Sequence, residues 1–226
     1  MTRLLALTLL LVSAPAFAQT LVASFSQDAP APAATPSLAA YAGFYATDGG
    51  MIEVRDGGSA LVLVAHGAPV AERLVGFAAP SYADARTATL LDAWVSGDLA
   101  PMIAAVRPER RERATESFER YRAALVRGHG EVIAASVVGT FERVDGPETT
   151  LVRILFEHGT EWASFVWNEQ NELVTVTRGL SPVVIGMASP TARDTFAGGG
   201  TEITFEREAD GRIDTVTIGE RFVAIR

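Results

Sequence analysis

Two residue types that often carry covalent chemistry are missing from this chain. Its 226 residues include no cysteine, and all 19 residues of the lysine and arginine class are arginine. A thiolate nucleophile, a disulfide and a cysteine metal site are therefore excluded. The absence of lysine excludes a Schiff base, a phosphate-loop lysine and a Ser-x-x-Lys nucleophile pair. No Gly-x-Ser-x-Gly elbow is present, so acid–base chemistry by carboxylate or tyrosine groups is what stays open.

The histidines do not have the spacing of a metal site. A mononuclear site usually needs three or four ligands, some of them close in sequence. His66, His129 and His158 are far apart, and only His158 and Glu161 share a short segment, across a predicted turn. We therefore expect no metal and no cofactor, and we place each histidine in a loop or at a hairpin end.

Four residues in the second half of the chain could line a ligand pocket. Tyr121 lies on an apolar helical stripe, and Arg153 lies on a predicted strand, where a guanidinium could receive an anionic group. Trp162 and Trp167 are an odd number of positions apart, so a regular strand directs them to opposite faces. Each also has a structural alternative, which is core packing for the aromatic residues and a salt bridge or surface position for Arg153. The candidate pocket is thus Tyr121, Arg153, Trp162 and Trp167, and no catalytic residue is assigned.

The net negative charge of the chain indicates which classes of partner are disfavoured. A formal net charge of -8 repels nucleic acid and anionic membrane surfaces, so neither is expected. The basic cluster from Arg107 to Arg113 is interleaved with Glu109 and Glu112. Such mixed signs are typical of a solvated helix face.

The first residues resemble an export signal. Arg3 precedes a short apolar stretch, and Ala16-Phe17-Ala18 fits a signal-peptidase site. We predict cleavage after Ala18, a periplasmic or secreted protein, and no membrane span after cleavage. Residues 19–37 are rich in proline and alanine, which indicates a linker.

The remaining pattern predicts helices between two groups of strands. The first strands are expected at residues 43–46, 51–54, 60–65 and 71–75. Helices are expected at residues 83–95 and 99–106, and a third begins at Pro108 and ends near Gly128. Its apolar stripe is Ala114, Phe118, Tyr121 and Leu125. Later strands are expected at residues 132–144, 150–157, 161–167, 173–178, 201–206, 213–218 and 221–225.

Two resemblances follow from these segments. Leu38 to Tyr45 with its hairpin, then Phe196, Ile203 to Arg207 and Asp210 to Ile213, resemble the lipocalin-like β-domain that accompanies secreted penicillin-recognising serine hydrolases. In that family these pieces lie close together, whereas about 100 residues, the size of a small domain, separate them here. The chain lacks the family's Ser-x-x-Lys motif. The resemblance therefore implies an accessory part without its enzyme.

The middle of the chain resembles a second family. Leu90 to Trp94, Ser96 to Asp98, the Phe118 to Leu125 stripe and Gly130 are similar to the nuclear-transport-factor-like cone fold, which ketosteroid isomerase shares. Catalysis in that fold uses polar groups in its cavity, typically an aspartate base with tyrosine or acid donors. Candidates would be Tyr121, Arg153, Glu157 and the polar positions between Glu161 and Asn168.

Together these observations predict an α+β protein. A lipocalin-like antiparallel β-domain is split by an inserted cone-shaped domain of three helices on a four-stranded antiparallel sheet. The expected division is a signal peptide (1–18), a linker (19–37), a split β-domain (38–82 and 180–226) and an inserted domain (83–179). The opening and closing segments are expected to share one sheet.

For function we expect an exported, non-catalytic accessory module. It would bind a small, partly apolar or anionic ligand or a protein partner. One alternative is a small hydrolase or isomerase with carboxylate or tyrosine acid–base chemistry in the insert. Another is a structural or assembly protein, and a homodimer through the sheet of the insert is a further expectation.

Overall fold

The structure is a computed structural model that describes residues 37–77, 81–144, 146–220 and 222–226. The predicted signal peptide and nearly all of the predicted linker lie outside these residues. The described residues belong to one compact unit, and 47% of them are in strands against 29% in helices.

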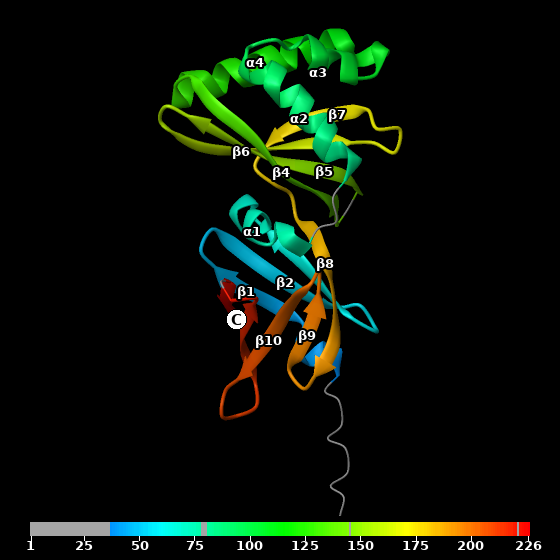
Figure 1. The fold of residues 1–226 in the computed structure, drawn as a ribbon, viewed down its shortest axis with the longest axis vertical. Coiled ribbons are helices and arrows are strands. Elements are labelled where there is room, and N and C mark those ends of the chain that lie inside the picture. Colours follow the sequence, from blue (N-terminus) through cyan, green and yellow to red (C-terminus); the bar gives the residue numbers. More distant parts are fainter. Residues whose placement is uncertain (1–36, 78–80, 145, 221) are drawn as a thin grey trace, which may run out of the picture. The chain divides into compact units, whose positions relative to one another are not determined.

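Eight strands close into an antiparallel barrel (Figure 1). They run in the spatial order β3-β2-β1-β12-β11-β10-β9-β8, and pairing between β3 and β8 completes the circle. The strands are β1 (Gly43–Thr47), β2 (Gly50–Asp56), β3 (Leu61–His66), β8 (Val183–Ala192), β9 (Thr195–Gly198), β10 (Thr201–Arg207), β11 (Ile213–Ile218) and β12 (Phe222–Ile225). β1 pairs with β12, with Ala46 opposite Ile225. The opening and closing segments therefore share one sheet, as expected.

Large apolar side chains fill the barrel interior. Tyr41, Tyr45, Leu61, Leu63 and Phe196 are almost completely buried in one cluster. An eight-stranded barrel is just wide enough for side chains to fill it or for one small ligand. Here buried side chains fill the interior as a packed core.

The sheet continues beyond the barrel. β4 (Val132–Arg143) pairs with β8 where Glu142 and Arg143 lie opposite Val184 and Val183. The strands β5 (Gly146–Phe156), β6 (Gly159–Trp167) and β7 (Leu173–Arg178) follow in order, and β7 is the last strand of the sheet.

Helices cover one face of this extension (Figure 1). They are α2 (Tyr82–Val95), α3 (Ala100–Ala105) and α4 (Arg111–His129), with a 3-10 turn η3 (Pro108–Arg110) before α4. Leu90, Leu91 and Trp94 of α2 and Phe118 and Leu125 of α4 are buried against β5 and β6. The helical periodicity is confirmed here, although α4 continues through Gly128 and ends before Gly130, where φ is +82°.

Three shorter helical segments complete the described chain. They are α1 (Ala68–Arg73), η1 (Leu38–Ala40) and η2 (Val75–Phe77). The strand predicted at residues 71–75 is wrong, because Pro69 stands at the first turn of α1, a position that favours a helix start. Val70, Ala71 and Leu74 then have helical spacing and are buried with the barrel core.

The predicted α+β class with a cone-shaped insert of three helices is wrong. The described chain is mainly β, and its largest feature is the closed eight-stranded barrel. β4 to β7 do not form a sheet of their own, because the pairing of β4 with β8 makes them part of one 12-stranded sheet. Local periodicity could not reveal this pairing, because its partners are some 40 residues apart in sequence.

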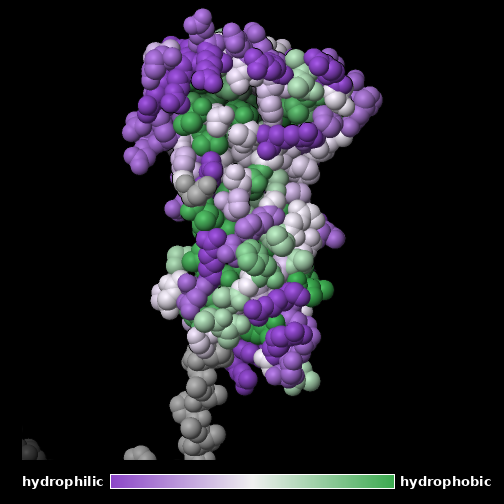
Figure 2. Space-filling view, turned by 180° about the vertical axis from the view of Figure 1, so that it is seen from behind, coloured by the Kyte–Doolittle hydropathy of each residue, from purple (hydrophilic) through white to green (hydrophobic). Residues whose placement is uncertain are grey.

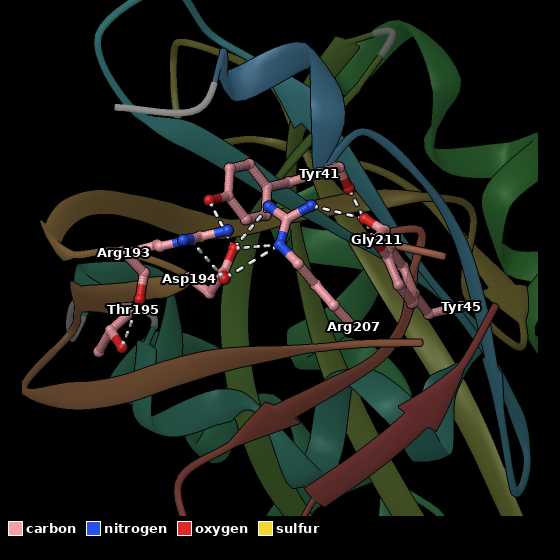
Figure 3. A network of polar contacts seen from close by, with 7 residues as sticks. All are labelled: Tyr41, Tyr45, Arg193, Asp194, Thr195, Arg207 and Gly211. Carbon is pink, nitrogen blue, oxygen red and sulfur yellow. Dashed lines mark hydrogen bonds and ion pairs between the residues drawn. The ribbon is translucent and has the colours of Figure 1, made fainter. Parts of the chain in front are cut away.

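A polar network fastens one end of the barrel (Figure 3). Asp194, in the β8–β9 turn, has a left-handed φ of +59°. Its carboxylate accepts a hydrogen bond from the Tyr41 hydroxyl at 2.9 Å and from Arg207 Nη2 at 2.6 Å. Arg207 Nη1 donates to the Gly211 carbonyl at 2.8 Å. Segments from both ends of the chain are thus joined at one carboxylate.

Candidate functional site

The structure places the four predicted pocket residues at three separate positions. Arg153 and Trp162 lie opposite each other on β5 and β6. Both contact Glu72 of α1, with Arg153 Nη1 at 3.0 Å from Oε1 and Trp162 Nε1 at 3.0 Å from Oε2. Arg153 is thus salt-bridged, and these two side chains join α1 to the sheet.

Trp167 belongs to a buried hydrogen-bond chain on the helical side. Its Nε1 donates to the Thr150 hydroxyl at 3.0 Å, which is 2.7 Å from the Thr140 hydroxyl. Thr140 donates to Asp84 at 2.7 Å, and Asp84 also caps α2. Because the carboxylate can only accept, the chain donates in one direction, from Trp167 to Asp84. Arg86 lies over the Trp167 ring, 4.9 Å from its centroid.

Tyr121 lies beside a charged cluster formed by β6, β7 and the end of α4. Glu161 accepts from Arg178 Nε at 2.9 Å, and His129 Nε2 is 3.0 Å from its carboxylate. Burial and the nearby Glu161 charge raise the pKa of Tyr121 to about 12. Its hydroxyl is buried and has no hydrogen-bond partner among the described residues. The phenol is therefore protonated at neutral pH, and the Glu161 carboxylate already contacts both Arg178 and His129.

The other histidines also have specific surroundings. His66 Nε2 is 2.8 Å from the Glu53 carboxylate, which Arg55 also contacts. The hydrogen bond from Arg55 has the larger effect in lowering the pKa of Glu53, and the contact with His66 lowers it further. His158 lies at the turn between β5 and β6, a hairpin end as expected. Within the described ranges no group of three or more His, Asp or Glu residues could hold a metal ion.

Three of the open cavities that described residues line lie in the helical part and the adjoining hairpins. One, of about 550 Å³, lies between α2 and α3, and its single charged residue, Arg86, already donates to the Asn171 carbonyl. A second, of about 520 Å³, is lined by the exposed carboxylates Glu142, Glu148 and Glu169. None of the three is lined by a buried carboxylate.

The third cavity, which we call the α4–β7 groove, combines an apolar floor with uncommitted positive charge. It has a volume of about 360 Å³ and is lined by Val106, Arg110, Arg113, Ala114, Ser117, Phe118, Val174 and Thr175. Phe118 and Val106 are buried beneath it, while Val174 on β7 is 40% exposed. Figure 2 shows hydrophobic surface beneath the hydrophilic layer that covers the helical end.

The two arginines at this groove differ from their neighbours in the basic cluster. Arg107 Nε donates to Glu172 at 2.5 Å, and Arg111 Nε donates to the Val106 carbonyl at 3.1 Å. Across the part of the chain that the structure describes, the side chains of Arg110 and Arg113 make no hydrogen bond or ion pair. Their guanidinium groups are therefore available to an anion.

The sequence interpretation missed this groove. It treated the cluster from Arg107 to Arg113 as one solvated face. A signal was present in Ala114 and Ser117, which are small residues one turn before or beside Phe118 on the same helix. Small side chains next to a buried aromatic ring leave space above it.

Comparisons of the chain with protein-family models, with curated proteins and with solved structures gave no match. None of the described helices is long and apolar enough to cross a membrane.

Proposed function

We propose that this protein is a non-catalytic binding module whose α4–β7 groove takes a partly apolar anion. One observation carries the proposal: Arg110 and Arg113, whose side chains make no hydrogen bond or ion pair in the described structure, border an apolar floor that includes Phe118 and Val174. A carboxylate, sulfonate or acidic side chain would pair with the guanidinium groups. The apolar part of the same molecule would cover the floor.

The sequence offered an acid–base enzyme as an alternative, and the described cavities support it less well. A general base should reach the cavity in a deprotonated form near neutral pH. Glu161 is occupied by Arg178 and His129, and the Asp194 carboxylate by Arg207 and Tyr41. The binding module is therefore the better reading of these contacts.

Two further proposals concern the relationship of the barrel to a known fold and the export of the protein. The barrel is compatible with a lipocalin-like fold, and we propose that it is related to the accessory β-domain of secreted serine hydrolases. We also propose that the protein is exported. Amino-terminal sequencing of the mature protein from the periplasm would check this, with Gln19 as the expected first residue.

The anion-binding proposal is tested with 8-anilinonaphthalene-1-sulfonate, a fluorescent apolar anion. At about 0.3 kcal/mol per non-hydrogen atom, a ligand of about 20 atoms reaches a Kd of tens of micromolar. The double variant Arg110→Gln/Arg113→Gln should weaken binding about tenfold, because each exposed ion pair contributes about 0.5–1 kcal/mol. Added salt should weaken binding to the unaltered protein as well.

The matched control is Arg120→Gln/Arg127→Gln. These exposed arginines lie on α4 outside the groove, so this variant removes the same charge elsewhere on the helix. Equal loss of binding in both variants would show that net charge, rather than the groove, attracts the probe.

A further inference from the structure

The edge of β7 beside the groove has no strand partner. β7 is the last strand of the sheet, and none of the described strands pairs with its outer side. On its inner side the Gly179 N–H donates to the Trp162 carbonyl at 2.8 Å. Residues of an antiparallel strand alternate in the direction of their backbone groups. Thr175 and Thr177 therefore face β6, while Val176 and Arg178 present their N–H and C=O groups outward.

The groove adjoins this open edge directly. Val174 and Thr175 belong both to β7 and to the groove lining. An extended chain lying along β7 would therefore satisfy the outward backbone groups and also pass over the apolar floor at Phe118. Its acidic side chains could reach Arg110 and Arg113 on the opposite wall.

On the basis of the proposed function, we infer that the occupant of the α4–β7 groove is an extended, acidic segment of a partner protein, added to β7 as an extra strand. Backbone pairing needs a row of N–H and C=O groups, which a polypeptide has and a lipid or nucleic acid lacks. Unpaired positive charge on the groove wall requires a negatively charged strand.

A second copy of this chain is a weaker candidate for the same edge. Self-pairing of β7 would bring Arg110 and Arg113 of both copies to one interface. Like charges at an interface disfavour association. An acidic partner removes this repulsion.

The inference is tested with a fluorescein-labelled peptide of two aspartates followed by three alternating valine–threonine pairs. Binding to the full protein is measured by fluorescence anisotropy. A second peptide has the same sequence with N-methyl groups on all six valine and threonine residues, which removes the backbone donors of both strand edges but keeps the charge and the side chains. We expect the N-methylated peptide to bind at least tenfold more weakly.

A protein variant tests the same contact from the other side. Val176→Pro removes an outward N–H while leaving the backbone bonds of Thr175 and Thr177 to β6 in place, and proline is tolerated on edge strands. It should weaken peptide binding at least tenfold and change 8-anilinonaphthalene-1-sulfonate binding less than twofold. A circular-dichroism melt checks its folding, and the N-methylated peptide decides the matter if this variant does not fold.

The outcomes separate this inference from the proposed function. Absence of peptide binding up to 1 mM, or equal affinity for both peptides, would overturn strand addition while leaving anion binding intact. If Arg110→Gln/Arg113→Gln alters the affinity for neither 8-anilinonaphthalene-1-sulfonate nor the acidic peptide, the proposed function fails. Native mass spectrometry showing a dimer that Val176→Pro abolishes would assign the edge to a second copy and overturn the acidic-partner inference.

Discussion

Asp194 is the residue at which the polar contacts of the barrel end converge. Its carboxylate pairs with Arg207 and Tyr41, and only 19% of its side chain is exposed. The hydrogen bond from Arg207, and after it that from Tyr41, lowers the pKa of Asp194 below its ordinary value of 3.8. Burial and the neighbouring carboxylate raise the pKa of Tyr41. One side chain therefore couples η1, the β8–β9 turn and β10.

This coupling predicts a specific acid sensitivity. A folded-state pKa below the unfolded one stabilises the fold above the unfolded pKa, and this contribution is lost as pH falls through the lowered value. Arg207→Gln should lower the unfolding free energy at pH 7 by about 1–3 kcal/mol. It should also lose less further stability than the unaltered protein between about pH 5 and pH 2. Urea unfolding at several pH values measures both effects.

Arg212→Gln is the control for this prediction. Arg212 forms an exposed ion pair with Glu208, and 64% of its side chain is accessible. This control variant should leave the unfolding free energy nearly unchanged at pH 7. Parallel pH profiles for the unaltered protein and Arg207→Gln would contradict the role given to Asp194.

At the residue scale, sequence reasoning identified side chains more readily than their partners. It named Arg153 and Trp162, but Glu72, which contacts both, lies some 80 to 90 positions earlier in the chain. It also separated Trp162 and Trp167 correctly by strand alternation, since they lie in different clusters. Long-range partners depend on strand pairing, which local spacing does not encode.

At the element scale, local order was predictable and pairing between distant strands was not. α2 was expected at residues 83–95 and spans Tyr82–Val95, because its apolar residues and its Ser81 cap act locally. The antiparallel hairpins from β4 to β7 were predictable for the same reason, because each strand pairs with the next one along the chain. The pairing of β4 with β8 overturned the predicted separate four-stranded sheet. The α4–β7 groove depends on how the extended sheet places β7.

The β8–β9 hairpin gives a prediction at this scale. A Cβ at Gly198 would lie 2.2 Å from the Met187 carbonyl oxygen, a backbone atom of β8 that cannot move independently. Gly198→Ala should therefore lower the unfolding free energy by about 1–3 kcal/mol, as overpacking does. Thermal or urea unfolding measures the change.

Gly128 is the matched control, because it lies within α4 and a Cβ there would meet nothing within 4 Å. Gly128→Ala should raise the unfolding free energy by about 0.5–1 kcal/mol, since alanine is the better helix former. Similar effects of both substitutions would show that close approach at Gly198 does not limit the barrel.

At the scale of the whole molecule, the barrel is built from both ends of the chain. Residues 43–66 and 183–225 supply its eight strands, and their side chains share one core. The division into a split β-domain and an inserted segment stays a prediction. Deleting residues 83–179 and joining the ends with a short linker should leave a cooperatively unfolding barrel. A non-cooperative melt of this shortened chain would contradict the predicted division.

The barrel and the helical layer differ in whether they contain an open cavity. The barrel core is filled by side chains, whereas the helical layer and β7 carry the open groove and the two uncommitted arginines. Binding at β7 should therefore leave the barrel interior unchanged. This separation is what makes the location of the ligand a decisive observation.

The most direct test is a titration of ¹⁵N-labelled protein with 8-anilinonaphthalene-1-sulfonate, followed by amide chemical shifts. We predict the largest shifts at Arg113, Ser117, Phe118, Val174 and Thr175, with little change in the barrel strands. Shifts concentrated at barrel residues such as Tyr45, Leu63 and Phe205, with none along α4 and β7, would contradict the groove as the binding site.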